Sequence, residues 1–208
     1  MPDLTICIAH KHTQRNDAAL KVALDCILDN TRCDYELLID STTPADPYVV
    51  YNKLVKQSAT PWCILTNSDV FFAPNWDVEW LAHADEYTIL SGILVECGAI
   101  GVATGNLKHN FGMTPETFDR ATFETWAETV PMPKGDGWYM PCLMPRDEFL
   151  DLGGFDLRGT FGIDPVDKWF WDTWETSGGL VKRVRSIAYH LQNWSNPIEQ
   201  QKEVRNDV

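Results

Sequence analysis

Two acidic side chains stand directly after apolar runs that read as buried strands. Asp69 ends the polar triplet Asn67-Ser68-Asp69, which follows the run from Trp62 to Thr66. Asp40 follows the run from Tyr35 to Ile39 in the same way. An acid at the exit of a strand can present its oxygens to a divalent cation, whereas a turn or a helix cap is its alternative role. Asp69 is the stronger candidate for such a metal site, and Asp40 marks a second acid at the carboxyl end of a strand.

Two histidines and two basic residues, Lys11 and Arg15, follow the first apolar run in the loop from His10 to Asn16. His10 and His12 would project to the same side of an extended segment, which is a geometry that can hold a metal. Because no third ligand is evident nearby, we favour a polar contact to a nucleotide instead. Arg15 and Lys53 could assist a phosphate, although basic residues near helix ends are commonly only solvated.

The common phosphate-binding loops are missing from this sequence. The loop after the first strand contains no glycine, so the G-x-G-x-x-G fingerprint of dinucleotide-binding domains is absent. The Walker-type loop is absent as well. Both absences remove the usual ways in which an α/β sheet holds phosphates without a metal, and they favour carboxylates combined with a cation.

These residues must be positioned by alternating strands and helices. Apolar runs predict strands at 4–9, 35–39, 62–66, 88–95, 138–144 and 180–190. Helical spacing predicts helices that open at residue 17 and span 48–58, 75–83, 115–127 and 146–152, with a last one around 166–174. We therefore expect a single α/β domain with a mostly parallel central sheet flanked by helices. The loops after Ala9, Ile39 and Thr66 would then share the ligand-binding edge.

Composition excludes several classes of partner. The 208 residues carry 17 Lys and Arg against 30 Asp and Glu, and the resulting net charge of −13 opposes binding to nucleic acid or to an anionic membrane. No apolar run approaches the roughly 20 residues that span a bilayer. The N-terminus lacks a secretory signal, and six cysteines without a C-x-x-C pair fit a reducing compartment. We expect a soluble, cytoplasmic protein.

Five features in order carry a family resemblance. They are the apolar strand and polar loop at 4–16, the acid-ended strand at 37–41, the triplet at 67–69, the tetrad Gly153-Gly154-Phe155-Asp156, and His190 after the last strand. In this order the chain, over about residues 4–195, resembles glycosyltransferase family 2. The tetrad, about 85 residues after the triplet, is the most specific of the five.

This resemblance implies a fold and an activity. The domains of the family adopt the GT-A fold, a Rossmann-like architecture, and move a sugar from a nucleotide diphosphate donor. Here it implies a nucleotide-binding half at about 1–105 and an acceptor half at about 106–195. The expected enzyme is a hexosyl- or deoxyhexosyltransferase that uses a UDP-sugar and a hydroxyl acceptor on a glycan or glycoconjugate.

The resemblance also implies which residues bind the donor. Asp40 resembles the acid that accepts a hydrogen bond from the uracil base, and the backbone at Ala9 and His10 would lie along the nucleoside. Asn67 stands where the family often has Asp, so it could bond the ribose but would be a poor metal ligand. Ser68 of the same triplet joins the donor-binding set, together with Arg15 of the first loop.

A metal pair and a general base complete the implied site. Asp69 matches the acid that holds the metal, and His190 resembles the histidine that completes its ligand set. A carboxylate, an imidazole and two diphosphate oxygens suit Mn²⁺, with Mg²⁺ as the alternative. A cation is also needed because an acidic protein would otherwise repel a diphosphate.

The general base has two candidates, Asp164 and Asp167. Inverting members of the family usually carry acids at E-D-x-D spacing, but Ile163 occupies the Glu position here and the two acids are three residues apart. We favour Asp164, although it could instead cap the helix that Pro165 begins. Asp167 would lie in the first helical turn, where the helix dipole favours any acid. If neither acid acts as the base, inversion itself is in doubt.

Two other functions remain open. A sugar-phosphate nucleotidyltransferase would use a similar sheet edge, but it would show a Gly-rich basic loop after the first strand. A non-catalytic carbohydrate-binding module could use some of the nine tryptophans alone. Trp138, Tyr139, Trp169 and Trp171 are candidates for stacking on a sugar, and a place in the core is the alternative for each of them.

Overall fold

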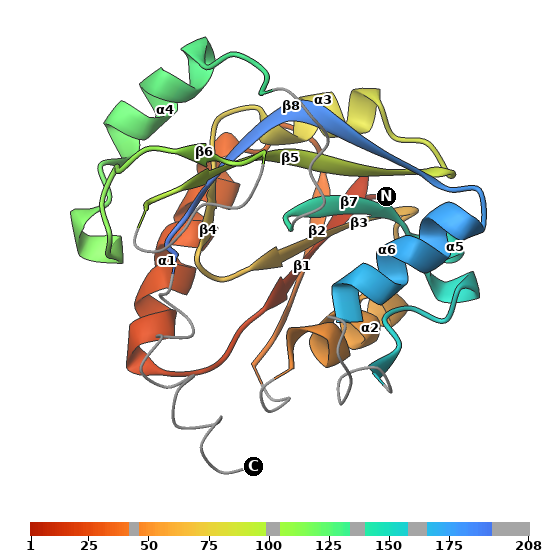
Figure 1. The fold of residues 1–208 in the computed structure, drawn as a ribbon. Helices are drawn as coiled ribbons and strands as arrows, with labels where there is room; N and C mark the ends of the chain where they lie inside the picture. Colours follow the sequence, from red (N-terminus) through yellow and green to blue (C-terminus); the bar gives the residue numbers. More distant parts are fainter. Residues whose placement is uncertain (42–45, 99–104, 134–139, 158–165, 193–208) are drawn as a thin grey trace, which may run out of the picture.

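A curled, mixed sheet of eight strands forms the centre of the molecule, as the computed structural model in Figure 1 shows. The structure describes residues 1–41, 46–98, 105–133, 140–157 and 166–192. The strands are β1 (Leu4–Ala9), β2 (Tyr35–Asp40), β3 (Trp62–Asn67), β4 (Val70–Phe72), β5 (Thr88–Glu96), β6 (Leu107–Lys108), β7 (Cys142–Pro145) and β8 (Leu180–His190). They follow the order β2-β1-β3-β7-β5-β8-β4, and β6 pairs with β5 outside this path.

The prediction of a mostly parallel sheet is wrong. The pairs β1–β2, β1–β3, β5–β6 and β5–β8 are parallel, but β7 runs antiparallel to both β3 and β5, and β4 runs antiparallel to β8. An apolar run reveals a buried strand but not its direction, because either direction buries the same side chains. The strands β4 and β6 were also missed, since three and two residues are too few to show a pattern.

Helices cover both sides of this sheet. They are α1 (Gln14–Asn30), α2 (Pro47–Gln57), α3 (Trp76–Ala82), the 3₁₀ turn η1 (Pro115–Thr117), α4 (Arg120–Thr129), α5 (Arg146–Asp151) and α6 (Val166–Thr176). In Figure 1, α2, α5 and α6 lie together on one side, while α1 and α4 lie on the other. The first group closes a core around Tyr51, Phe149, Phe155 and Phe170, and Ala19 of α1 packs with Phe123 of α4 in a second core.

Local side-chain bonds set the helix starts. Thr13 accepts a hydrogen bond from the backbone of Asn16, so α1 begins at Gln14, three residues before the expected start at Asp17. The helix expected at 115–127 is divided into η1 and α4, because Asp119 accepts a bond from Thr122 and starts a new helix. The other predicted helices and strands agree with the structure to within a few residues where it describes them.

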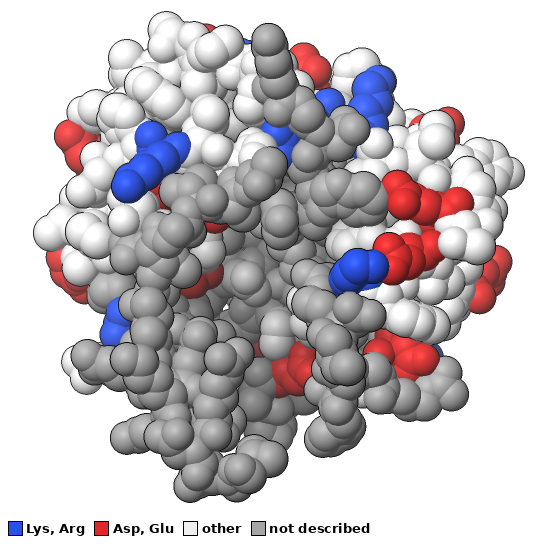
Figure 2. Space-filling model, viewed as in Figure 1, with Lys and Arg blue, Asp and Glu red and all other residues white. Residues whose placement is uncertain are grey.

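Charged side chains lie on the viewed surface (Figure 2). Figure 2 shows acidic side chains on several parts of the viewed face. Within the described ranges, no helix is long and apolar enough to cross a membrane.

Of the tryptophans considered for sugar stacking, Trp171 is buried in the core, whereas Trp169 is exposed. Trp138 and Tyr139 lie outside the described residues.

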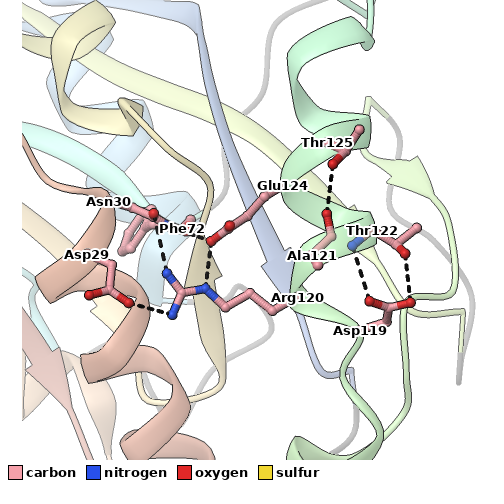
Figure 3. A network of polar contacts seen from close by, with 9 residues as sticks. All are labelled: Asp29, Asn30, Phe72, Asp119, Arg120, Ala121, Thr122, Glu124 and Thr125. Atoms are coloured by element: carbon pink, nitrogen blue, oxygen red, sulfur yellow. Dashed lines mark hydrogen bonds and ion pairs between the residues drawn. The ribbon is translucent and has the colours of Figure 1, made fainter.

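Arg120 ties α4 to α1 in a polar network (Figure 3). Its guanidinium donates to Asp29 at 2.8 Å and to Glu124 at 2.6 Å. Asn30 donates to Glu124 and to the carbonyl of Phe72 in β4, which extends the network to the sheet. This network fixes α4 beside the sheet, next to the strands β4 and β8 that carry the candidate site at their ends.

Candidate functional site

Three strand ends meet at one edge of the sheet. Ala9 pairs with Asp40 across β1 and β2, and Ala9 also pairs with Asn67 across β1 and β3. The backbone N–H of His10 donates to the carbonyl of Asp40 at 3.1 Å, so the chain continues this pairing one residue beyond the strand. The structure therefore brings Ala9, His10, Asp40 and Asn67 together at the edge where the sequence predicts a ligand.

Side chains from α2 fix two of these residues. The buried carboxylate of Asp40 is 2.6 Å from the Lys53 ammonium, which is itself about half exposed. The hydroxyl of Tyr51 donates to Asn67 Oδ1 at 2.7 Å. Burial raises the pKa of Tyr51 well above its usual value, so its hydroxyl stays a neutral donor. Asp40 and Asn67 are thus held in place before any ligand arrives.

Asp69 and His190 come together from two distant parts of the chain. Asp69 lies between β3 and β4, and β4 pairs with the end of β8 so that Val70 stands opposite His190. The N–H of Leu191 donates to the backbone carbonyl of Asp69 at 3.1 Å. As a result Nε2 of His190 is 3.9 Å from Oδ1 of Asp69, whose side chain is buried. Ser68 is buried beside them in the triplet.

Glu96 holds the other side of the His190 ring. It pairs with His190 across β5 and β8, and its Oε2 is 2.9 Å from His190 Nδ1. Its Oε1 accepts a hydrogen bond from the Asn106 amide at 3.1 Å. Because a carboxylate accepts, this contact places the proton of the neutral ring on Nδ1 and leaves the Nε2 lone pair on the side of Asp69. A carboxylate and an imidazole with a free lone pair form a donor set that suits a divalent cation.

The surroundings of His190 shift its protonation. Burial lowers the pKa of the imidazole, but the hydrogen bond to Glu96 and the negative charges of Asp69 and Glu96 outweigh burial and raise it above its ordinary value. A ring surrounded by two carboxylates attracts positive charge, either as a proton or as a metal ion. The site is therefore electrostatically suited to a cation.

Glu96 is a site residue that the sequence pattern did not single out, although a signal for it exists. The residue ends the apolar run that starts at Thr88, in the same way as Asp40 ends the run at 35–39. An acid at a third strand exit could have been added to the candidates on this pattern. Its pairing with His190, however, depends on the parallel register of β5 and β8, which the sequence does not reveal.

The histidines of the first loop have a third partner that is not evident from the sequence. Asp17 Oδ1 is 2.8 Å from His10 Nε2 and 3.0 Å from His12 Nδ1. The ligand atoms of these three residues lie within 4.8 Å of one another, so the group could hold a metal ion. The sequence predicts that Asp17 opens a helix, whereas α1 begins at Gln14 and Asp17 lies in its first turn. Arg15 lies exposed in the same helical turn.

The Gly-Gly-Phe part of the tetrad forms a left-handed turn after α5. Gly153 and Gly154 have φ values of 86° and 71°, which glycine adopts more easily than other residues. Asn52 of α2 donates to the carbonyl of Phe155 and accepts from its N–H, both at 2.8 Å. This pair of hydrogen bonds holds the turn against α2, and the Phe155 ring packs on Phe149.

The described part of the structure includes neither side chain of the two candidates for a general base. Asp164 lies outside the described residues, and Asp167 lies in α6 with a side chain that is not described. Their assignment remains a prediction from the sequence.

Comparison with known proteins shows the fold. No known protein family and no curated protein matches the sequence. Among solved structures, the crystal structure of GalNAc-T7 with UDP, GalNAc and Mn²⁺ is similar, with a TM-score of 0.60 at 10% sequence identity. The match covers 94% of this chain and 45% of GalNAc-T7, so this chain spans less than half of that protein. The chain thus has a GT-A-like glycosyltransferase fold.

Proposed function

We propose that this chain is a metal-dependent glycosyltransferase that moves a hexosyl or deoxyhexosyl group from a UDP-sugar to a hydroxyl of a glycan or glycoconjugate. The observation that carries the proposal is the facing pair of Asp69 and His190, 3.9 Å apart, at the sheet edge that also holds Asp40. The likeness to a protein solved with UDP, GalNAc and Mn²⁺ supports the same chemistry.

Asp40 would recognise the base of the donor. Uracil presents an imide N–H, and a buried carboxylate beside it accepts that hydrogen bond at low cost if its charge is already balanced. Lys53 supplies this balance at 2.6 Å. Asn67, which Tyr51 orients, and the neighbouring Ser68 would contact the ribose, with the backbone of Ala9 and His10 along the nucleoside and Arg15 near the phosphates.

Asp69 and His190 would hold the cation, with Mn²⁺ expected and Mg²⁺ as the alternative. These two ligands fit this role, because His190 Nε2 faces the Asp69 carboxylate. Glu96 holds the proton of the neutral ring on Nδ1, which leaves Nε2 able to bind a metal. A bound divalent cation supplies positive charge that offsets the diphosphate and the charge that develops on the departing nucleotide. Asp69 and His190 would bind and orient it there.

Glu96 acts as a positioning residue in this proposal. It does not contact the donor; it selects the tautomer of His190 and fixes the plane of the ring. Asn106, which donates to its second oxygen at 3.1 Å, restricts the Glu96 side chain in turn. A ring fixed in this way loses less rotational freedom when it binds an ion, which favours binding.

Asp164 or Asp167 would take the proton from the acceptor hydroxyl as that hydroxyl attacks the anomeric carbon. Asp167 stands at the start of α6, which packs through Phe170 against the same core as the Gly-Gly-Phe turn. Of the two acids, we favour Asp164 as the general base because of its position in the sequence.

A donor panel tests the proposed function without knowledge of the acceptor. The protein is incubated with UDP-, GDP- and dTDP-sugars in Mn²⁺, and release of the free nucleotide diphosphate is followed. We expect slow hydrolysis of a UDP-sugar that stops in EDTA and in the Asp69→Asn variant. Release of pyrophosphate from a nucleoside triphosphate and a sugar phosphate would indicate a nucleotidyltransferase instead. Sugar binding that is indifferent to EDTA and cleaves no donor would indicate a binding module.

A further inference from the structure

The group formed by His10, His12 and Asp17 has no place in the proposed donor and metal chemistry as a unit. His10 stands directly after β1, His12 lies in the loop, and Asp17 lies in the first turn of α1. We propose that these three side chains bind a transition-metal ion of the zinc class, separate from the ion that Asp69 and His190 would hold.

The distances within the group fit one ion. Zinc-class ions bind imidazole nitrogen and carboxylate oxygen at about 2.0–2.2 Å, so two neighbouring ligands of one ion lie about 2.8–3.5 Å apart. Asp17 Oδ1 is 2.8 Å from His10 Nε2 and 3.0 Å from His12 Nδ1. All three ligand atoms lie within 4.8 Å of one another. Small side-chain shifts are therefore enough to surround an ion.

Two of the three ligands are fixed in advance. The side chain of His10 is 3% exposed, and its backbone N–H bonds to the carbonyl of Asp40. His10 Nδ1 has no hydrogen-bond partner among the described residues, so the contact through Nε2 is what fixes the ring toward Asp17. Asp17 is held by the α1 backbone, since its N–H donates to the Thr13 carbonyl at 2.8 Å. An ion would then order mainly His12.

The outer side of the group is open. The side chain of His12 is 77% exposed and that of Asp17 is 38% exposed. Three protein ligands on one side and solvent on the other leave positions for water or for a ligand. The site lies on the loop after β1, next to the strand end where Ala9 pairs with Asp40. A bound ion would therefore hold this loop against α1 at the ligand edge of the sheet.

The ligand types select the class of ion. Two imidazoles with one carboxylate suit Zn²⁺, Co²⁺ or Ni²⁺, whereas Mg²⁺ and Ca²⁺ prefer oxygen ligands alone. The net charge of −13 raises the local concentration of any divalent cation around the protein. All three ligands come from side chains of this chain and none from a nucleotide, so the site would bind its ion without a donor and is independent of the proposed function.

The test titrates the full chain with Co²⁺ alone and follows the visible absorption that cobalt gains in a site with nitrogen ligands. We expect His12→Ala and Asp17→Asn to weaken Co²⁺ binding by more than about tenfold, since even outer-shell partners of a metal are worth 10–100-fold. His83→Ala is the matched control, because His83 is also exposed and lies 3.6 Å from a carboxylate, that of Glu79, without a second imidazole. It should bind Co²⁺ as the parent does.

Asp69→Asn separates the two metal sites. If this variant keeps the Co²⁺ absorption that His12→Ala removes, the site formed by His10, His12 and Asp17 exists whether or not UDP binding needs a metal. If His12→Ala and Asp17→Asn bind Co²⁺ with the parental affinity, the three residues are only a hydrogen-bonded group and the proposal is wrong. The proposal is also wrong if all Co²⁺ absorption depends on Asp69, and in that case the proposed function would remain intact.

Discussion

Glu96 Oε2 lies 2.9 Å from His190 Nδ1, across a parallel pair of strands whose partners are 94 residues apart in sequence. This contact determines which ring nitrogen of His190 faces Asp69. It also means that the candidate metal site depends on a third strand end, that of β5, in addition to the ends of β3 and β8. Because Glu96 contacts the ring through Nδ1, its role can be tested separately from those of Asp69 and His190.

Replacement of Glu96 by Gln should weaken cation binding. Glutamine has the same size, but its amide can donate to Nδ1 and so stabilise the tautomer that has its proton on Nε2. We expect the affinity for Mn²⁺ in the presence of UDP to fall by about 10–100-fold, measured from the spin-resonance signal of free Mn²⁺. The control is Glu79→Gln, which alters another Glu–His pair, 3.6 Å long, within and just after α3.

The tautomer itself can be observed without any metal. At a pH above the raised pKa of His190, nitrogen chemical shifts of its ring should show a proton on Nδ1 in the parent and on Nε2 in Glu96→Gln. A parent-like tautomer together with parent-like Mn²⁺ affinity in this variant would show that Glu96 only fills space in the strand end.

Asp40 should control the choice of base. Removing the carboxylate in Asp40→Ala should weaken UDP by about 1–3 kcal/mol and reduce the preference for UDP over CDP, because cytosine lacks the imide N–H. Asp40→Asn retains an acceptor oxygen but loses the ion pair with Lys53, so it should keep much of the preference. Calorimetric titration of both nucleotides into each variant measures this, and equal losses in the two variants would assign Asp40 to the ion pair alone.

The two glycines of the tetrad should differ in their tolerance of a side chain. Both have positive φ, so replacement by Ala should cost about 1–2 kcal/mol of unfolding free energy at each position. A Cβ at Gly154 would also lie 2.5 Å from Asn52 Oδ1, whereas a Cβ at Gly153 would meet nothing within 4 Å. Gly154→Ala should therefore be the more destabilised in urea unfolding. Equal losses would mean that the Asn52 contact adds nothing.

The cap of α4 should make a pH-dependent contribution to stability. Hydrogen bonds from the side chain and the backbone N–H of Thr122 lower the pKa of Asp119 below its ordinary value. A lowered folded-state pKa means that this stabilisation is present above the unfolded value and is lost as the pH falls through the folded value. Asp119→Asn keeps a capping oxygen but does not titrate, so its thermal midpoint should fall less steeply in acid than that of the parent. Parallel curves for the two proteins would contradict this.

Catalysis should be separable from donor binding at the candidate bases. Asp164→Asn or Asp167→Asn should leave the Kd for the UDP-sugar near its parental value while transfer falls by about 10²–10⁴. Asp69→Asn should lose binding and transfer together. Near-parental transfer in both base variants would remove these residues from the mechanism and would put an inverting reaction in doubt.

The sequence predicted those parts of the molecule that local patterns control. Apolar runs predicted the first three strands, and helical spacing predicted the helices between them. The expectation that the loops after these strands share one edge agrees with the structure, since β1 pairs in parallel with β2 and β3 and brings Ala9, Asp40 and Asn67 together. The direction of β7 and the existence of β4 were not predictable, since they depend on long-range pairing. The contact between Glu96 and His190 was not predictable for the same reason, because these two residues meet only through the register of β5 and β8.

If Asp69 and His190 hold a cation against the donor, UDP should stabilise the protein against heat mainly when that cation is present. At a hundredfold excess of UDP over its Kd, binding should add about 2.7 kcal/mol of stability. We predict that UDP raises the thermal midpoint in Mn²⁺, that EDTA removes most of this increase, and that Asp69→Asn and His190→Ala remove it as well. An equal increase in EDTA, or an undiminished increase in both variants, would show that UDP binds without a cation held by Asp69 and His190.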